Sequence, residues 1–305
     1  MNRQRGHRYH DRVQTVTHMV AAADGRQLCV EEAGDLSGPV SLVHWGTPNS
    51  RHHYGPIASK AAADGIRLVS YDRPGFGKSS PQPGRTVASC VADVQAVADA
   101  LGVQRLVVWG ISGGGPHALA CAALLPDRVA AVATLASPAP FAAPGLDYFA
   151  GMGTGNAEDI RLLMEDPGSA RAKWKRDREE LLAGTASQLA ESLDTMLSPV
   201  DRDVLTSGFA AWMMAGFRDG LAPGDQGWWD DSVALRSPWG FDMASISVPV
   251  QVWHGRQDKF VPFQHGQWLA RHVPGAHPQV SDHEGHLTLL ENRIPEIHRW
   301  LLGHL

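Results

Sequence analysis

A serine with a glycine two residues before it and two residues after it is the strongest candidate for covalent chemistry in this 305-residue chain. The segment Gly110-Ile111-Ser112-Gly113-Gly114 follows a short apolar run that ends at Trp109 and precedes a run of small residues. A serine between a strand and a helix sits on a tight, strained turn, and this turn leaves no room for bulk two residues away on either side. The N–H of Gly113, at the start of the predicted helix, can donate to an oxyanion. We therefore predict that Ser112 is a nucleophile; the alternative is an ordinary glycine-rich turn.

A hydroxyl nucleophile needs a base, and that base needs a carboxylate to orient it. His286 follows the last predicted strand, and Asp258 follows the strand that ends at His254. Both positions are loops at the carboxyl ends of predicted strands, which favours His286 as the base and Asp258 as its partner. His283 is the second candidate for the base. The structural alternatives are a surface histidine and an aspartate that stabilises its own turn.

A second oxyanion donor is expected after the third predicted strand, in His44-Trp45-Gly46-Thr47-Pro48. A loop at this place has to bring another backbone N–H to the substrate oxygen. We predict that Thr47 supplies this N–H and that Gly46 lets the substrate approach closely.

The elements that must position these residues alternate along the chain. Continuous apolar runs separated by helical patterns indicate a mostly parallel sheet with helices on both faces, and therefore an α/β fold. The predicted strands are 16–23, 27–33, 40–44, 66–71, 106–109, 129–135, 248–254 and 277–281, and the predicted helices are 57–63, 86–101, 113–125, 263–273 and 287–302.

The alternation breaks between residues 141 and 243, where the chain is mainly helical and irregular and contains five of the ten tryptophans. We predict that residues 16–140 and 244–305 form one domain, that residues 141–243 form an inserted helical cap, and that residues 1–15 are a loose tail. The cap residues Met213, Met214 and Phe217 and its tryptophans either line an apolar pocket or form the cap's own core.

Composition limits the partners of the protein. The apolar content of 43% and the net charge of −5, with no long run of one sign, are typical of a globular protein and predict binding to neither nucleic acid nor membrane. The three cysteines form no CxxC pair, and no secretory signal is visible, so we expect core thiols in the reducing cytoplasm. We expect a small-molecule acyl substrate, no cofactor and no metal site; the sequence leaves the oligomeric state open.

As a set, these motifs resemble the α/β-hydrolase superfamily, in the branch with an inserted cap. The resemblance runs from about Thr17 to Leu305 and is weakest in the cap. It implies an eight-stranded sheet, a helical lid after the sixth strand, and Ser112, Asp258 and His286 as a triad in the family's chain order. The resemblance rests on Gly46-Thr47-Pro48, Asp72-Arg73-Pro74-Gly75-Phe76-Gly77-Lys78-Ser79, the segment 110–116, the segment 254–262 and Glu284-Gly285-His286.

Two departures bear on function. Trp45 stands directly before Gly46, where family members often have histidine, so hydrogen bonding in this loop is expected to differ. The run Gly113-Gly114-Gly115-Pro116 is closer to bacterial hydrolases of mostly unassigned substrate than to well-known lipases. Members that open epoxides or remove halogens use an aspartate at the elbow, and Ser112, which cannot form their alkyl-enzyme ester, argues against those activities.

The expected reaction is hydrolysis of a carboxylic ester or a related acyl bond through an acyl-enzyme. A lactonase, a thioesterase, an amidase or peptidase, a carbon–carbon hydrolase and an acyl-transferring biosynthetic enzyme remain open within the same fold. Asp230 or Asp231 would serve an iminopeptidase if either captured a substrate amine. A non-enzymatic ligand-binding member of the fold is the alternative from a different class.

Overall fold

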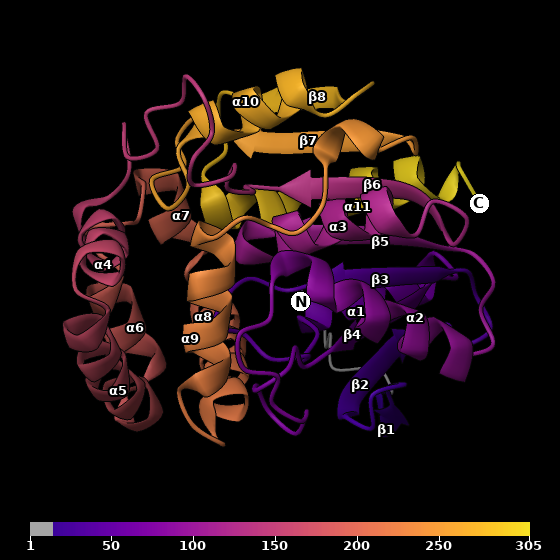
Figure 1. Ribbon diagram of the computed structural model, residues 1–305, viewed down its shortest axis with the longest axis horizontal. Coiled ribbons are helices and arrows are strands. Elements are labelled where there is room, and N and C mark those ends of the chain that lie inside the picture. Colours follow the sequence, from indigo (N-terminus) through magenta and orange to yellow (C-terminus); the bar gives the residue numbers. More distant parts are fainter. Residues whose placement is uncertain (1–14) are drawn as a thin grey trace, which may run out of the picture.

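An eight-stranded sheet forms the centre of the molecule in a computed structural model that describes residues 15–305 (Figure 1). The strand order is β1-β2-β4-β3-β5-β6-β7-β8; β2 pairs in antiparallel fashion with both β1 and β4, and the other five pairs are parallel. The prediction of a mostly parallel eight-stranded sheet is therefore confirmed. The loose tail was predicted for residues 1–15, and residues 1–14 lie outside the described residues. The strands are β1 Val16–Ala21, β2 Gln27–Gly34, β3 Val40–His44, β4 Arg67–Tyr71, β5 Leu106–Ile111, β6 Val129–Leu135, β7 Val250–Gly255 and β8 His277–Ser281.

Helices cover both faces of the sheet, as the continuous apolar strands require. One face packs against α2 (Cys90–Ala100), α3 (Gly115–Leu124) and α10 (Phe263–His272), and the other against α1 (Gly55–Ala63) and α11 (His286–Leu302). The central strand β5 serves both layers: Leu106 and Val108 join one apolar cluster, while Val107 and Trp109 join the other. This alternation follows from the two-residue period of a strand.

Six helices lie between β6 and β7 in the chain, within residues 141–243. Figure 1 shows them beyond the ends toward which the arrows of β6 and β7 point. They carry small apolar clusters of their own, one around Trp174 and one around Met214 and Phe217. By contrast, Trp239, which follows the last of these helices, packs into the core cluster beneath α2 and α3. The helices are α4 Thr154–Glu165, α5 Pro167–Ala183, α6 Ala186–Ser192, α7 Pro199–Val204, α8 Ser207–Leu221 and α9 Gln226–Arg236.

Local sequence signals start several of these helices. Asp166 caps α5 by accepting the N–H of Ser169 at 3.0 Å, and a proline occupies the first turn. Ser198 caps α7 in the same way, with Pro199 after it. The segment therefore specifies its helices locally, while its position on the sheet depends on long-range contacts.

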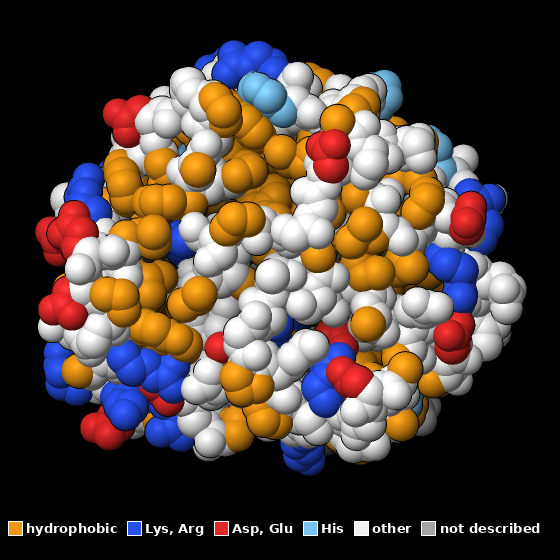
Figure 2. Space-filling view, in the orientation of Figure 1, with side chains coloured by type: hydrophobic (Ala, Val, Ile, Leu, Met, Phe, Trp, Pro, Cys, Tyr) orange, Lys and Arg blue, Asp and Glu red, His pale blue; other side chains and the backbone are white. Residues whose placement is uncertain are grey.

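The surface shown in Figure 2 carries both signs of charge, with apolar side chains exposed between them over the inserted helices. Among residues 15–305, no helix is both long enough and apolar enough to cross a bilayer.

An ionic cluster joins α8 to the core near β2. His52 lies between two carboxylates, with Nδ1 at 2.9 Å from Glu31 and Nε2 at 3.4 Å from Asp219 of α8. The Arg51 guanidinium pairs with the same Asp219 at 2.6 Å and with the buried Asp72 at 2.7 Å. Asp219 thus connects α8 to this part of the core.

This cluster predicts a pH-dependent contribution to stability. Hydrogen bonds to Asp219 and Glu31 raise the pKa of His52 to about 9. Its contribution should therefore be complete below the unfolded value of about 6.5 and disappear as the pH rises through 9. We expect the difference in melting temperature between wild type and His52→Gln to be largest near pH 6 and to vanish by about pH 10. A gap that stays constant over this range, or one shared by the exposed-site control His277→Gln, would contradict the assignment.

Candidate active site

Ser112 sits at the junction between β5 and a short 3-10 turn, Ser112–Gly114, with a backbone φ of 53°. Positive φ is rare for a residue other than glycine and marks stored strain. A Cβ on Gly110 would collide with the carbonyl oxygen of Gly114, and one on Gly114 would collide with that of His44. The predicted need for small residues on both sides of the serine is thus explained by these two close approaches.

The structure brings His286 and Asp258 together across two loops. His286 Nδ1 lies 2.8 Å from Asp258 Oδ2, and because an ionised carboxylate only accepts, the ring must donate through Nδ1–H. This tautomer leaves Nε2 free to act as a base. Asp258 Oδ1 accepts the backbone N–H groups of Phe260 at 2.8 Å and Val261 at 2.9 Å, which fixes the carboxylate. His283, the second candidate for the base, is exposed.

Neighbouring charges shift the pKa values of both members of this pair. Burial would raise the pKa of Asp258, but His286 and His254 lower it to about 2. Burial would equally lower the pKa of His286, yet the carboxylates of Asp258 and Asp201 outweigh it and leave this pKa above its usual value. At neutral pH Asp258 is therefore a fixed anion beside a titrating imidazole.

The loop after β3 lies against the serine turn. A Cβ on Gly46 would be 3.3 Å from the Ser112 Cβ and 3.8 Å from its Oγ. A Cβ on Gly113 would be 2.7 Å from Thr47 Oγ1. Within residues 15–305, no hydrogen bond uses the backbone N–H of Thr47. The two predicted donors therefore lie close to each other and to the serine.

Comparison with known proteins identifies the family. A sequence model of the α/β-hydrolase fold matches residues 39–293. This chain belongs to the α/β-hydrolase family. It is 29% identical over 192 residues to epoxide hydrolase B of Mycobacterium tuberculosis, covering 61% of this chain but spanning only about half (52%) of that relative. It is 26% identical over 258 residues to the bifunctional esterase/perhydrolase DCH of Acinetobacter calcoaceticus, covering 80% of this chain and 83% of the relative. The crystal structure of the enol-lactonase from Burkholderia xenovorans LB400 superposes with a TM-score of 0.67 at 18% identity, over 94% of this chain and 99% of that one.

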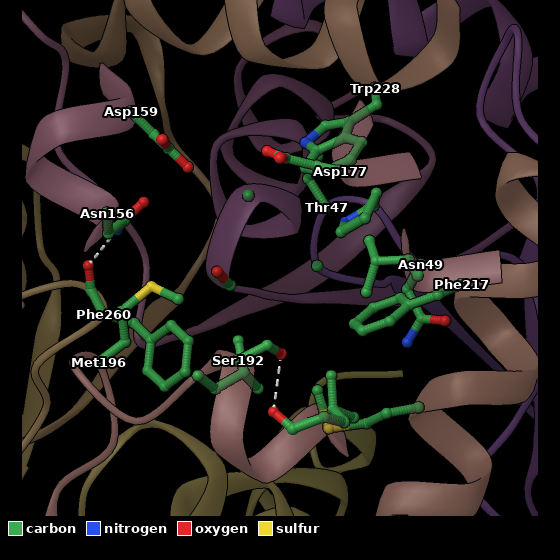
Figure 3. A pocket seen from close by; sticks show the side chains of 18 of the residues that line it. Thr47, Asn49, Asn156, Asp159, Asp177, Ser192, Met196, Phe217, Trp228 and Phe260 are labelled. Carbon is green, nitrogen blue, oxygen red and sulfur yellow. Dashed lines mark hydrogen bonds between the residues drawn. The ribbon is translucent and has the colours of Figure 1, made fainter. Parts of the chain in front are cut away.

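A large cavity opens above Ser112 in this α/β hydrolase. It has a volume of about 920 Å³, and Ser112, Gly113, Thr47 and His286 all line it. Most of the wall is apolar and comes from the inserted helices (Figure 3). The predicted lining residues Met213, Met214, Phe217, Trp174, Trp212 and Trp228 face this cavity.

A few charged groups interrupt the apolar wall. Asp159 and Asp177 line the cavity, and Figure 3 shows them in the upper part of the view. Lys173 pairs with both carboxylates, at 3.0 Å and 2.5 Å, and so offsets part of their charge.

Two acids of the inserted helices, Asp230 and Asp231, do not face the cavity and so cannot capture a substrate amine there. Asp231 is fully buried and pairs with Arg73 and Arg85, and Asp230 is buried and accepts from Gln226 at 2.9 Å. Neither aspartate lines the cavity. That hypothesis was wrong because helix α9 turns these acids toward the core, a direction that sequence alone does not specify.

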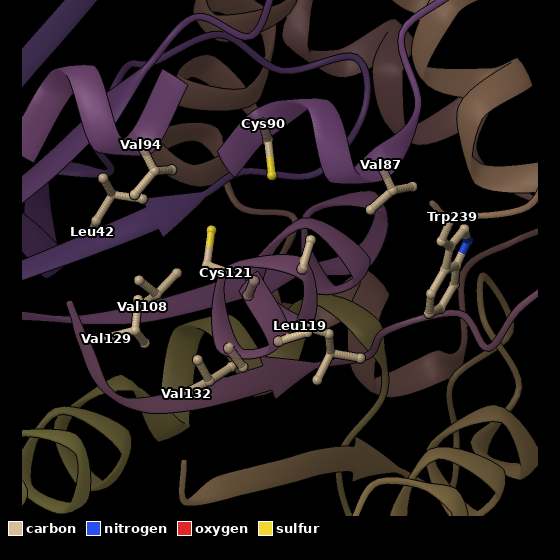
Figure 4. Packing of buried hydrophobic residues seen from close by; sticks show 14 of the residues in the cluster. Leu42, Val87, Cys90, Val94, Val108, Leu119, Cys121, Val129, Val132 and Trp239 are labelled. Carbon is tan, nitrogen blue, oxygen red and sulfur yellow. The ribbon is translucent and has the colours of Figure 1, made fainter. Parts of the chain in front are cut away.

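One buried group among the described residues has the residue types of a metal site. The ligand atoms of His44, Cys90 and Cys121 lie within 4.8 Å of one another, and Figure 4 shows both thiols among apolar side chains of the core. Cys121 Sγ lies 3.7 Å from His44 Nε2, and burial raises the pKa of Cys90 well above its usual value, which opposes the thiolate that a metal requires. We interpret the three atoms as a thiol–imidazole contact of the core. All three cysteines of the chain are buried and free, as the sequence predicted.

Proposed function

We propose that this α/β hydrolase cleaves carboxylic esters with large apolar groups through an acyl-enzyme on Ser112. The observation that carries the proposal is the His286–Asp258 hydrogen bond of 2.8 Å, with His286 facing the same cavity as Ser112, Gly113 and Thr47. Nucleophile, base, orienting carboxylate and oxyanion donors thereby come from four separate loops at one edge of the sheet.

The reaction follows from these positions. His286 Nε2 takes the proton from Ser112 Oγ as the oxygen attacks the ester carbonyl, and Asp258 stabilises the resulting imidazolium. The N–H groups of Gly113 and Thr47 hold the oxyanion of the tetrahedral intermediate; loss of one such donor usually costs about 2.7–4 kcal/mol in the barrier. The alcohol leaves with the proton from His286. His286 then takes a proton from water as the water oxygen attacks the acyl carbon, and it returns that proton to Ser112 Oγ as the acid leaves.

The cavity wall supports an apolar substrate. A cavity of about 920 Å³ lined by methionine, tryptophan and phenylalanine side chains accommodates a long or bulky acyl chain. Each buried methylene contributes about 0.8 kcal/mol of transfer free energy, so binding should strengthen with chain length until the cavity is filled.

The serine also decides between reactions of the family. Opening an epoxide through an alkyl-enzyme ester requires a carboxylate at position 112, so Ser112 favours acyl chemistry despite the relative named as an epoxide hydrolase. Lactones and thioesters present the same carbonyl to Ser112. Transfer of the acyl group to an alcohol or amine in place of water would use the same steps, and product analysis with an added alcohol separates the two.

Turnover of p-nitrophenyl esters from acetate to palmitate tests the proposal. Wild-type kcat/KM should rise with chain length over the first members of the series. Ser112→Ala provides the inactive reference, and Ser59→Ala, an exposed serine of α1, provides a control that should retain full activity. If the wild-type protein is no faster than Ser112→Ala on every ester, the esterase proposal is wrong.

The pH profile gives a second test. Only neutral His286 can accept the serine proton, and its pKa is raised above the usual value because Asp258 and Asp201 outweigh its burial. We expect kcat/KM to increase with pH with a midpoint above about 6.5. Asp258, with a pKa of about 2, stays charged throughout this range. A profile that is flat between pH 5 and 8 would argue against a histidine base.

A further inference from the structure

The predicted cap contributes a buried carboxylate to the backbone at His286. Asp201 of α7 is fully buried, and its Oδ2 accepts the N–H of His286 at 3.0 Å. Its Oδ1 accepts the N–H groups of Leu287 at 2.8 Å and Thr288 at 3.2 Å. These are the first N–H groups of α11 and have no partner within the helix. A residue 85 positions earlier in the chain therefore caps the helix that begins at His286.

The surroundings show that this contact is built into the fold. A Cβ on Gly285 would collide with the Asp201 carboxylate, so the glycine before His286 makes room for it. Ser198 Oγ donates to Asp201 Oδ2 at 2.8 Å. The carboxylate charge also lies near enough to the imidazole to help raise the pKa of His286.

A second buried carboxylate of the same segment holds the loop that carries Thr47. Asp231 of α9 accepts from Thr47 Oγ1 at 2.6 Å and from Arg73 Nε at 3.1 Å. The Arg73 Nη1 atom in turn donates to the carbonyl oxygen of Trp45 at 2.6 Å, and Arg85 pairs with Asp231 at 2.6 Å. The loop is thus held on both sides of Gly46 by groups that meet at one carboxylate.

We infer that Asp201 and Asp231 are positioning residues through which the inserted helices set the catalytic geometry: Asp201 fixes His286, and Asp231 fixes the oxyanion donor Thr47. The inference rests on the proposed function. It makes the cap segment a part of the catalytic apparatus in addition to a wall of the substrate cavity. Neither aspartate touches the substrate cavity, so each acts through the residue that it holds.

A merely structural role would have a different signature. Capping α11 or compensating two buried arginines would affect the melting temperature alone. If Asp201 positions the base, its loss would change the protonation of His286. If Asp231 positions Thr47, loss of their contact would lower kcat and leave KM nearly unchanged. The His286 titration, kcat and KM therefore distinguish positioning from a structural role.

Asp201→Asn is the first test, because asparagine keeps one acceptor oxygen and the size of the side chain while it removes the charge. We expect the acid limb of kcat/KM to move down by about 0.5 pH unit or more, and kcat to fall about 10- to 100-fold. Titration of His286 by NMR of ¹⁵N-histidine-labelled protein should show the same downward shift, independently of any substrate. Asp166→Asn is the control, since Asp166 also caps a helix of the inserted segment but is exposed, and its carboxylate accepts from Ser169 and from no group of α11 among the described residues.

Thr47→Val is the second test, because it removes the hydroxyl contacts to Asp231 and Arg73 and leaves the ion pairs of Asp231 with Arg73 and Arg85 in place. We expect kcat to fall about tenfold with little change in KM, since the oxyanion forms only after binding. Thr47→Ser should restore kcat. The rate at which a fluorophosphonate labels Ser112 should fall in parallel, and this rate needs no ester turnover.

The outcomes distinguish failure of the proposed esterase function from failure of the positioning roles of Asp201 and Asp231. A wild-type protein that hydrolyses no ester contradicts the proposed function, while the His286 titration and the labelling rates still test the positioning roles. If Asp201→Asn leaves the His286 titration and the pH profile unchanged, Asp201 does not position the base. If Thr47→Val changes KM but not kcat or the labelling rate, Thr47 only lines the cavity and the role of Asp231 is wrong.

Discussion

Replacing Ser112 by alanine should abolish ester turnover, with a fall in kcat of roughly 10⁴- to 10⁶-fold on the best p-nitrophenyl ester. The strained turn holds this hydroxyl, and its neighbours Ile111 and Gly113 carry no nucleophilic group that could take its place. Alanine removes the oxygen while it keeps the backbone, and the oxyanion donors remain. Melting temperature should change little, because Ser112 is only partly buried.

Wild type and Ser112→Ala must both be folded and equally pure for their rates to be compared. Circular dichroism and the activity of Ser59→Ala provide that check. A residual rate in Ser112→Ala within tenfold of wild type would mean that another residue attacks the ester, and the nucleophile assignment would fail.

Asp258→Asn should reduce kcat about 10⁴-fold with little effect on KM. The asparagine Oδ1 can still accept the N–H groups of Phe260 and Val261, so the loop should keep its shape. Its amide would, however, face His286 Nδ1 with a donor in place of an acceptor. The imidazole would then lose the tautomer that leaves Nε2 free to take the serine proton.

The matched control for this change is Asp282→Asn, an exposed aspartate that pairs with Arg256 near the same edge of the sheet. It should keep wild-type kcat. Equal losses in Asp258→Asn and Asp282→Asn would point to a general effect of charge at this edge rather than to orientation of the base.

The sequence predicts the fold and the candidate triad for a physical reason. Ser112, Asp258 and His286 each follow a strand, and the carboxyl ends of parallel strands meet at one edge of a sheet whatever lies between them in the chain. The observed ends of the strands differ from the predicted ones by a few residues; β7, for instance, begins at Val250 rather than at residue 248. Such shifts do not move a residue to another edge.

The contacts of the inserted helices could not be predicted in the same way. Acidic residues are common on exposed helix faces, so nothing in the sequence distinguishes the buried Asp201 and Asp231 from exposed acids of the same segment such as Asp203. Their burial depends on how α7 and α9 dock, and docking is a long-range property. Arg73 belongs to a segment that the family resemblance includes, but its link to Trp45 and Asp231 required the three-dimensional arrangement. Likewise, Trp228 lines the cavity whereas the adjacent Trp229 does not.

The most direct test of the central claim is to locate the reactive serine by mass spectrometry after treatment with a fluorophosphonate. This probe phosphonylates a serine only where a base and oxyanion donors activate it. We predict one modified serine per chain, on the peptide that contains Ser112, with no modification in Ser112→Ala. Modification of any other serine, or none at all in folded wild-type protein, would contradict the account.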